Sequence, residues 1–348
     1  MISIIVLVHN KLEMSRSCLS ALSIALADID HEVLCIDNAS VEDVSGLVDS
    51  ANDFANFHFI RNDENWTFSI ANNRAAAIAQ GDFFLFLNND VLVAPGSIRA
   101  LRDALAEQPT NGVAGAKLIY PTRKLQHAGI TQMLWGYASN YGVGARLDDD
   151  RFQNACERFA VTGAMMCLPR TVFEKVGGFD ARYRWGYEDV DLCLRVRAAG
   201  YRVRYVPDAT GVHVESATLG PIRSVRDLSE NYRTYRSTWD HELLPREKAY
   251  VDDLIQGGVR SVAVLGTGQA AWGVTRVLSD NGIRVAAYTS SRTDSCAESF
   301  CDRPIVPLES LSEVTFDRLM VASQYFFEFE ESVLSYDPTG APLFPALA

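Results

Sequence analysis

The sequence predicts an α/β protein: a nucleotide-binding type of sheet flanked by helices, followed by a smaller α/β unit. Apolar runs alternate with helix-like segments over roughly the first ninety residues, which is typical of βαβ units. Each run ends in polar residues, so polar side chains gather at the sheet edge where α/β proteins bind ligands. The alternation restarts after Val259, where a glycine-rich turn follows the next strand.

The first part of the chain should contain four strands with helices between them. We expect strands at 3–8, 32–36, 58–60 and 83–87, and helices from Leu12 and over 68–79. The fourth strand is an unbroken apolar run after Gly81, which predicts burial on both faces. Farther along, we expect a strand at 162–168, a helix from Asp189, one or two helices over 227–248, strands at 260–265, 284–288 and 317–322, and a helix at 272–279.

Asn88, Asn89 and Asp90 follow the fourth strand. A carboxylate with oxygen-bearing neighbours at this edge suits a hard divalent cation that also holds substrate phosphates. A simple polar turn explains the triplet equally well, because Asn and Asp favour turns. On this stretch alone both interpretations stay open.

Composition limits the classes of function. The chain has 348 residues, 48% of them hydrophobic, which suits two globular domains. Its net charge of -12 argues against nucleic acid as a partner and gives no attraction to an anionic membrane surface. We expect no transmembrane segment and no signal peptide, because long apolar runs and a basic start are missing.

The cysteines point to a reducing compartment. There are seven, an odd number, and none forms a Cys-x-x-Cys pair. We therefore expect buried free thiols and a cytoplasmic protein, with no disulfide framework and no zinc site.

Four blocks resemble glycosyltransferase family 2, the inverting nucleotide-sugar transferases with the GT-A fold. They read IIVLVHN at 4–10, VLCIDNAS at 33–40, ANNR at 71–74 leading into FLNND at 86–90, and GGFD at 177–180 followed by YEDVDL at 187–192. Each block alone is weak, but all four in order are a strong signal. The similar subgroup includes rhamnosyltransferases and other makers of bacterial surface polysaccharides.

The resemblance implies an activity. A sugar would move from a nucleotide-diphosphate donor to a saccharide or lipid-linked saccharide hydroxyl, in synthesis of capsule, O-antigen or cell-wall glycan. The cofactor would be a divalent metal, Mn²⁺ or Mg²⁺. The place would be the cytoplasm, with peripheral association at the inner face of the membrane left open.

The resemblance also assigns donor-binding residues. The set comprises Val8, His9, Asn10, Asp37, Asn65, Asn72, Asn88 and Asn89. The first three would line the nucleotide pocket, Asp37 would accept hydrogen bonds from the base or ribose, and Asn65 and Asn72 would lie near the phosphates. A backbone-satisfied strand end for His9 and an Asx-turn for Asp37 remain alternatives.

The metal site departs from the family pattern. The family usually has Asp-x-Asp, whereas Asn88 stands at the first position here and leaves only Asp90 as a carboxylate. His213 matches the family's late histidine and is the expected second ligand. An imidazole ligand would favour Mn²⁺ more than an all-oxygen site does. A lone histidine after a strand is otherwise usually structural.

By the same resemblance Asp189 is the catalytic base, with Glu188 as a supporting contact to the acceptor. Acidic residues at a helix start are also common for local reasons. The acceptor set comprises Gly163, Ala164, Trp185 and Tyr187, for which core packing is the alternative. The polar, glycine-rich segment 121–150 is expected to form a variable acceptor wall that includes His127, Trp135, Tyr137 and Tyr141.

We expect three regions: a GT-A domain at 1–226, a helical linker at 227–258 and a small Rossmann-like domain at 259–348. The last carries GTGQAA at 266–271, which fits the dinucleotide fingerprint, but Ser290, Ser291 and Arg292 stand where an acidic residue would bind ribose. These three residues could suit a 2′-phosphate or no ligand at all, and NAD(P) binding is not expected. A packing or assembly role is favoured, and homo-oligomerisation stays open.

Two rival functions remain. A nucleotidyltransferase would want a glycine-rich, basic phosphate loop after the first strand, and the chain has His9 to Glu13 there without glycine. The presence of Asn88 where the family usually has aspartate favours a non-catalytic scaffold with a dinucleotide-sensing tail. Release of nucleoside diphosphate from a nucleotide sugar would mark a transferase, pyrophosphate a nucleotidyltransferase, and neither product a scaffold.

Overall fold

The structure is a computed structural model that describes residues 1–134, 136–214, 225–290, 299–340, 342–344 and 346–347. These residues divide into two compact units. The first unit comprises 1–130 and 145–237, and the second comprises 131–144 and 238–348.

A mixed sheet forms the first unit, with strand order β10-β12-β6-β11-β4-β1-β2-β3. The four strands expected at the start are β1 (Ile2–Val8), β2 (His31–Asp37), β3 (Phe57–Arg61) and β4 (Phe83–Asn88). They run parallel, so their carboxyl ends meet at one edge. Strand β11 (Met165–Pro169) pairs antiparallel with β4. The predicted α/β class with a mixed sheet is confirmed.

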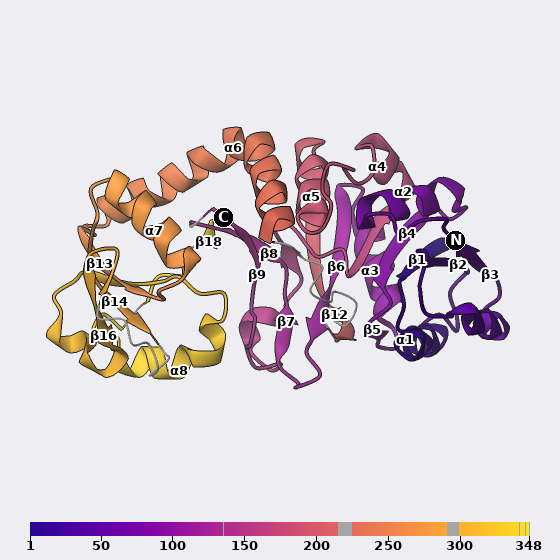
Figure 1. Ribbon diagram of the computed structural model, residues 1–348, viewed down its shortest axis with the longest axis horizontal. Helices are drawn as coiled ribbons and strands as arrows, with labels where there is room; N and C mark the ends of the chain where they lie inside the picture. Colours follow the sequence, from indigo (N-terminus) through magenta and orange to yellow (C-terminus); the bar gives the residue numbers. More distant parts are fainter. Residues whose placement is uncertain (135, 215–224, 291–298, 341, 345, 348) are drawn as a thin grey trace. The chain divides into compact units, whose positions relative to one another are not determined.

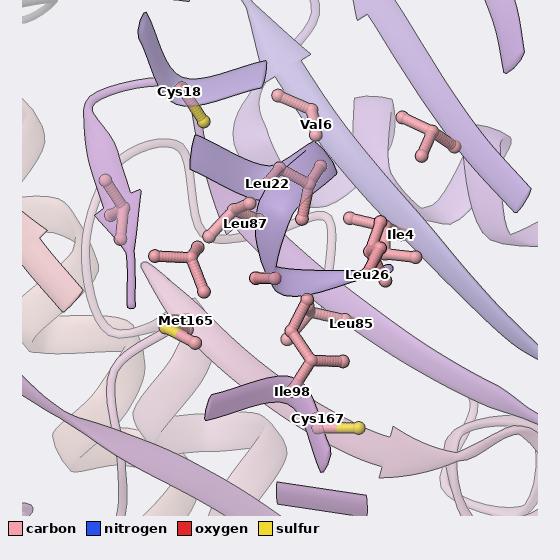
Figure 2. Packing of buried hydrophobic residues seen from close by; sticks show 14 of the residues in the cluster. Ile4, Val6, Cys18, Leu22, Leu26, Leu85, Leu87, Ile98, Met165 and Cys167 are labelled. Atoms are coloured by element: carbon pink, nitrogen blue, oxygen red, sulfur yellow. The ribbon is translucent and has the colours of Figure 1, made fainter. Parts of the chain in front are cut away.

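Helices cover both faces of this sheet (Figure 1). On one face lie α1 (Leu12–Ala25) and α3 (Ser97–Glu107), whose apolar residues share one core with β1 and β4. Figure 2 shows Leu22 of α1 and Leu26, the residue that follows this helix, among Ile4 and Val6 of β1. On the other face, α2 (Phe68–Ile78) and α4 (Arg170–Lys175) join an aromatic cluster with Phe86. Helix α5 (Glu188–Ala198) lies on the same side as these two.

The end of β12 (Arg202–His213) is brought to the ligand edge by two partners. It pairs parallel with β6 (Asn111–Ile119) and antiparallel with β5 (Val91–Val93). His213 stands opposite Val91, next to Asp90 in the chain. Strand β7 (Leu125–His127) then pairs antiparallel with β6. Residues far apart in the sequence therefore meet beside the end of β4.

The second unit contains a sheet with strand order β15-β16-β14-β13-β17. Its parallel strands are β13 (Ser261–Leu265), β14 (Arg284–Ser290), β16 (Arg303–Pro307) and β17 (Arg318–Val321), and α7 (Gln269–Asp280) follows the glycine-rich turn. The expected strands and helix are present. The segment 131–144 joins this unit, because β8 (Ile130–Met133) pairs with β18 (Ala346–Leu347).

One long helix, α6 (Val225–Gln256), stands where one or two helices were expected. It continues from the first unit into the second. The remaining elements are η1 (Ser45–Asp53), β9 (Ala138–Asn140), η2 (Asp150–Phe152), β10 (Cys156–Glu157), β15 (Ser299–Phe300), η3 (Leu308–Glu313) and α8 (Phe326–Tyr336). Within the described residues, no helix combines the length and apolarity needed to cross a membrane.

The core of the first unit yields a stability prediction. Leu85 of β4 is fully buried, whereas Leu92 of β5 is exposed. We expect Leu85→Ala to lower the free energy of unfolding by about 2–5 kcal/mol, the usual cost of a buried leucine truncation. Leu92→Ala should change it by roughly 0.5 kcal/mol or less. Guanidinium melts of both variants would test this, and equal effects would contradict the assigned core.

Candidate functional site

The two predicted metal ligands lie side by side. His213 ends β12 and Asp90 follows β4, and the His213 Nε2 and Asp90 Oδ1 atoms are 3.2 Å apart. Their side chains are 12% and 4% exposed. The strand pairing of β12 with β5 fixes this contact, because His213 stands opposite the residue after Asp90.

The ring of His213 is oriented by Gln126 of β7. Gln126 Oε1 lies 3.0 Å from His213 Nδ1, and an amide oxygen only accepts, so Nδ1 donates the proton. In the neutral ring Nε2 then carries a lone pair toward Asp90. A metal-binding histidine commonly donates its other N–H in this way.

The Asp90 carboxylate has an unsatisfied oxygen. Its Oδ1 is buried and accepts no hydrogen bond. Two lone pairs 3.2 Å apart repel unless a cation, either a second proton on His213 or a metal ion, lies between them. The donor set therefore fits a divalent metal. Across the described part of the chain there is no cluster of three or more His, Cys, Asp or Glu that could hold an ion.

The neighbours of Asp90 contribute less to a metal site than their position suggests. Asn89 is buried and donates to Ser15 Oγ of α1 at 2.8 Å. The Asn88 main chain is held by Ala164, whose carbonyl accepts from Asn88 N at 2.9 Å. Cys18 lies near Asp90, but burial, with the Asp90 charge, raises the pKa of its thiol. Cys18 is therefore a neutral thiol and a poor metal ligand.

Asp37 anchors a second polar cluster at the end of β2. It is 1% exposed, and its Oδ1 accepts from Ser40 N at 2.9 Å. Its Oδ2 accepts from the Arg61 guanidinium at the end of β3. Asp37 thus forms the Asx-turn and also lies at the carboxyl edge of the sheet. Any ligand at Asp37 would meet a carboxylate already neutralised by an arginine.

A chain of side-chain contacts links the ends of β1 and β2 to the loop before α2. His9 Nδ1 is 3.0 Å from the Asn38 carbonyl, and His9 Nε2 is 3.4 Å from Asn65 Nδ2. Asn38 also donates to Asn65 Oδ1 at 2.8 Å. Asn10, in the left-handed region, accepts from the amides of Val41 and Glu42. The structure brings these predicted residues together.

The side chains of two predicted donor-binding residues are buried inside the protein. Val8 is buried in the core of the sheet. Asn72 is buried in α2 and donates to the Phe68 carbonyl at 2.9 Å. Their predicted roles stay predictions, and these contacts are structural.

Asp189 lies in the first turn of α5, next to Glu188, and is half-buried. Its Oδ2 accepts from Gly163 N at 3.0 Å and its Oδ1 from Val190 N at 2.8 Å. Burial raises the pKa of the Asp189 carboxyl above its ordinary value, although hydrogen bonds from Gly163, Val190 and Thr162 act in the opposite direction. The Asp189 side chain thus holds a proton more strongly than an exposed aspartate does.

The predicted acceptor residues surround Asp189 in different ways. Gly163 binds its carboxylate, and a Cβ there would meet Phe68 Cζ at 3.2 Å and Asp189 Cβ at 3.5 Å. Ala164 is buried. Tyr187 stacks on Tyr235 with ring centroids 4.7 Å apart, so one face of the ring is covered. Close packing around Asp189 is therefore evident, and sugar contacts by this set stay a prediction.

Asp191 differs sharply from Asp189. It is buried, its Oδ2 accepts from Arg195 Nε at 2.8 Å, and its Oδ1 lies 3.4 Å from the Tyr183 hydroxyl. This carboxylate stabilises α5 from within.

Sequence reasoning missed three residues at the site: Arg61, Gln126 and Asn231. The sequence places Arg61 at a strand end and Gln126 next to His127. Neither position predicts which residue the side chain contacts. His127 itself is buried and accepts from Thr162 N at 3.4 Å. Trp135, Ser291 and Arg292, which carried earlier expectations, lie outside the described residues.

Two family models match the chain. The one described as "Glycosyl transferase family 2" covers residues 3–175, and the one described as "N-terminal domain of galactosyltransferase" covers residues 146–216. The first ends before Asp189 and the second includes both Asp189 and His213.

Three curated relatives are similar over part of the chain. An uncharacterized protein of Sinorhizobium fredii is 31% identical over 63% of this chain and 25% of its own length. An O-antigen biosynthesis protein of Myxococcus xanthus is 34% identical over 45% and 13%. An N-acetylglucosaminyl-diphospho-decaprenol L-rhamnosyltransferase of Mycobacterium tuberculosis is 30% identical over 40% and 49%. The chain thus spans half or less of these relatives.

A solved structure supports the fold. GalNAc-T7, crystallised with UDP, GalNAc and Mn²⁺, matches with a TM-score of 0.55 and 15% identity, over 72% of this chain and 50% of that one. At this identity the likeness concerns the fold alone. It confirms the predicted GT-A type of sheet.

The raised pKa of Asp189 predicts a pH-dependent stability difference. A carboxyl whose folded pKa exceeds its unfolded value stabilises the fold at low pH, and this contribution is lost as pH rises through the folded pKa. Asn cannot ionise. The melting temperature of Asp189→Asn minus that of the wild type should therefore increase from pH 3 to pH 7. A difference that is flat or decreasing with pH would contradict the raised pKa.

Proposed function

We propose that this chain, whose residues 3–175 match the model of glycosyltransferase family 2, transfers a sugar from a nucleotide-diphosphate donor to a saccharide hydroxyl. The observation that supports this best is the pair formed by Asp90 and His213 at the carboxyl edge of the sheet. A buried carboxylate oxygen without a hydrogen bond faces an imidazole nitrogen whose tautomer Gln126 selects.

Asp90 and His213 would hold a divalent cation, Mn²⁺ or Mg²⁺, together with oxygens of the donor diphosphate. When bound, the cation would neutralise negative charge that develops on the departing diphosphate. With a single carboxylate in the ligand set, the protein alone should bind the ion weakly. The diphosphate adds the missing negative charge, so metal and donor should bind cooperatively.

Asp189 would act as the general base. Its carboxylate would take the proton of the acceptor hydroxyl while that oxygen bonds to the anomeric carbon. The bond from the anomeric carbon to the diphosphate oxygen breaks in the same step, and its electron pair leaves with the nucleoside diphosphate. Attack from the face opposite the leaving group inverts the anomeric centre. The raised pKa of Asp189 makes it a stronger proton acceptor than an exposed aspartate.

The proposed role is synthesis of a bacterial surface polysaccharide. The relatives named as an O-antigen biosynthesis protein and as an L-rhamnosyltransferase acting on a lipid diphosphate support it. A lipid-linked acceptor would bring the protein to the inner face of the membrane. The nucleotide would lie near Asp37, His9 and Asn65, the polar cluster at the ends of β1 and β2.

We propose a structural role for residues 259–348, without NAD(P). The first residue of α7, Gln269, donates a side-chain hydrogen bond to the Tyr137 hydroxyl. A helix N-terminus of this kind would otherwise face the pyrophosphate of a dinucleotide. The segment 131–144 thus supplies a protein partner at that position.

Donor chemistry is tested first. We expect release of nucleoside diphosphate from at least one of dTDP-L-rhamnose, UDP-GlcNAc, UDP-GalNAc and GDP-mannose in the presence of Mn²⁺ and a synthetic N-acetylglucosaminyl-diphospho-lipid. Pyrophosphate release would indicate a nucleotidyltransferase instead. Absence of both products across the panel would favour a scaffold.

Metal binding is tested by calorimetry with MnCl₂, with and without the diphosphate of the active donor. Affinity should be weak alone and rise at least about tenfold with the nucleotide, while Asp90→Asn and His213→Ala should lose this cooperativity. His58→Ala, on the exposed side of β3, is the matched control and should behave as the wild type. Tight binding of Mn²⁺ to the free protein would count against the site.

The base is tested by Asp189→Asn. Transfer should fall by roughly 10²–10⁴-fold, as for loss of a general base, while binding of Mn²⁺ with nucleoside diphosphate stays within twofold. Asp191→Asn should lower the melting temperature, because it weakens the bond to Arg195, but the folded fraction should still transfer. A greater loss of transfer in Asp191→Asn would reassign the base.

A further inference from the structure

A single asparagine of α6 binds the loop that precedes α5. Asn231 is 2% exposed. Its Nδ2 donates to the carbonyls of Trp185 at 2.7 Å and Gly186 at 3.1 Å, and its Oδ1 accepts from Arg184 N at 3.2 Å. One side chain thus holds the main chain of three consecutive residues.

That loop has an unusual backbone. Gly186 and Tyr187 both lie in the left-handed region, with φ of 91° and 71°. The conformation is unfavourable for a side chain such as that of Tyr187, and such residues persist only where their surroundings hold them. Tyr187 is the N-cap of α5, and its carbonyl accepts from Asp191 N at 2.8 Å. The direction in which α5 begins therefore depends on this turn.

Tyr235 supports the turn from the same helix. It lies four residues after Asn231, hence on the same face of α6, and its fully buried ring stacks on Tyr187 at an interplanar angle of 29°. The two α6 side chains thus hold the main chain and the ring of the same short segment.

Asp189 lies two residues beyond Tyr187. Its carboxylate reaches Gly163 N at 3.0 Å only if α5 starts where the turn places it. A shift of the first helical turn would move the carboxylate relative to Gly163, and small misplacements of a reacting group are costly.

We propose that Asn231 is a positioning residue that fixes the 184–187 turn and thereby aims the Asp189 carboxylate at the acceptor hydroxyl. The inference rests on the proposed function, in which Asp189 is the base. Asn231 itself touches neither substrate nor metal.

The decisive variant is Asn231→Asp. It keeps the size and the acceptor for Arg184 N, but it puts a carboxylate oxygen opposite the carbonyls of Trp185 and Gly186. Asn231→Ala removes all three bonds without adding charge. Asn73→Asp is the matched control, because Asn73 makes the same kind of main-chain pair, at 2.8 and 2.9 Å, with Phe179, a residue outside the 184–187 turn.

We expect kcat for transfer from the active nucleotide sugar to fall at least about tenfold in both Asn231 variants, with binding of MnCl₂ and nucleoside diphosphate within twofold of the wild type. Asn73→Asp should lower the melting temperature and leave kcat of the folded protein within twofold. In the Asp189→Asn background, Asn231→Asp should cause no further loss, because coupled residues are not additive.

Three results would overturn the proposal: transfer within twofold of the wild type, a loss that adds in full to that of Asp189→Asn, or failure of both Asn231 variants to fold, which would make the residue purely structural. If Asp189→Asn itself transfers normally, the proposed base is wrong, and this outcome is distinguishable because it does not involve Asn231.

Discussion

An imidazole nitrogen and a buried carboxylate oxygen held 3.2 Å apart are the constraint on which this site depends. The fold enforces this contact from three directions. The pairing of β12 with β5 fixes the position of His213, the end of β4 fixes the position of Asp90, and Gln126 of β7 fixes the tautomer of the His213 ring. A positive charge between the two atoms, carried by a proton or by the proposed metal ion, would stabilise this arrangement.

The mixed sheet explains how the Asp90–His213 pair and Asp189 are held on one scaffold. Parallel β1, β2 and β4 deliver their polar ends to one edge, whereas β12 arrives from the other side of the sheet through β6. Strand β7 supports both the Asp90–His213 pair and Asp189. Its residue Gln126 contacts His213. The next residue, His127, accepts a hydrogen bond from the amide of Thr162, and the amide of the following residue, Gly163, binds Asp189. Adjacent residues of a strand point to opposite faces, so one short strand can support two centres.

The pattern of apolar and polar residues along the chain predicted most of the fold, because a buried strand and its polar end consist of consecutive residues. The fourth strand was expected at 83–87 and is observed at Phe83–Asn88. Asp90 followed from its place after that strand, and His213 and Asp189 from the resemblance of their surrounding blocks. Gln126, Arg61 and Asn231 could not be predicted, because their partners lie 87, 24 and 45–47 residues away and are chosen by sheet register and helix packing. The same holds for β8, which pairs with β18 near the far end of the chain.

The proposed transfer depends most on a cation bound between Asp90 and His213. The most direct measurement is anomalous diffraction at the manganese edge from crystals grown with MnCl₂ and UDP or dTDP. We predict an anomalous peak within coordination distance of both His213 Nε2 and an Asp90 carboxylate oxygen, with diphosphate oxygens as the further ligands. Nucleotide bound in the pocket with no anomalous peak at this pair, or with manganese bound elsewhere, would contradict it.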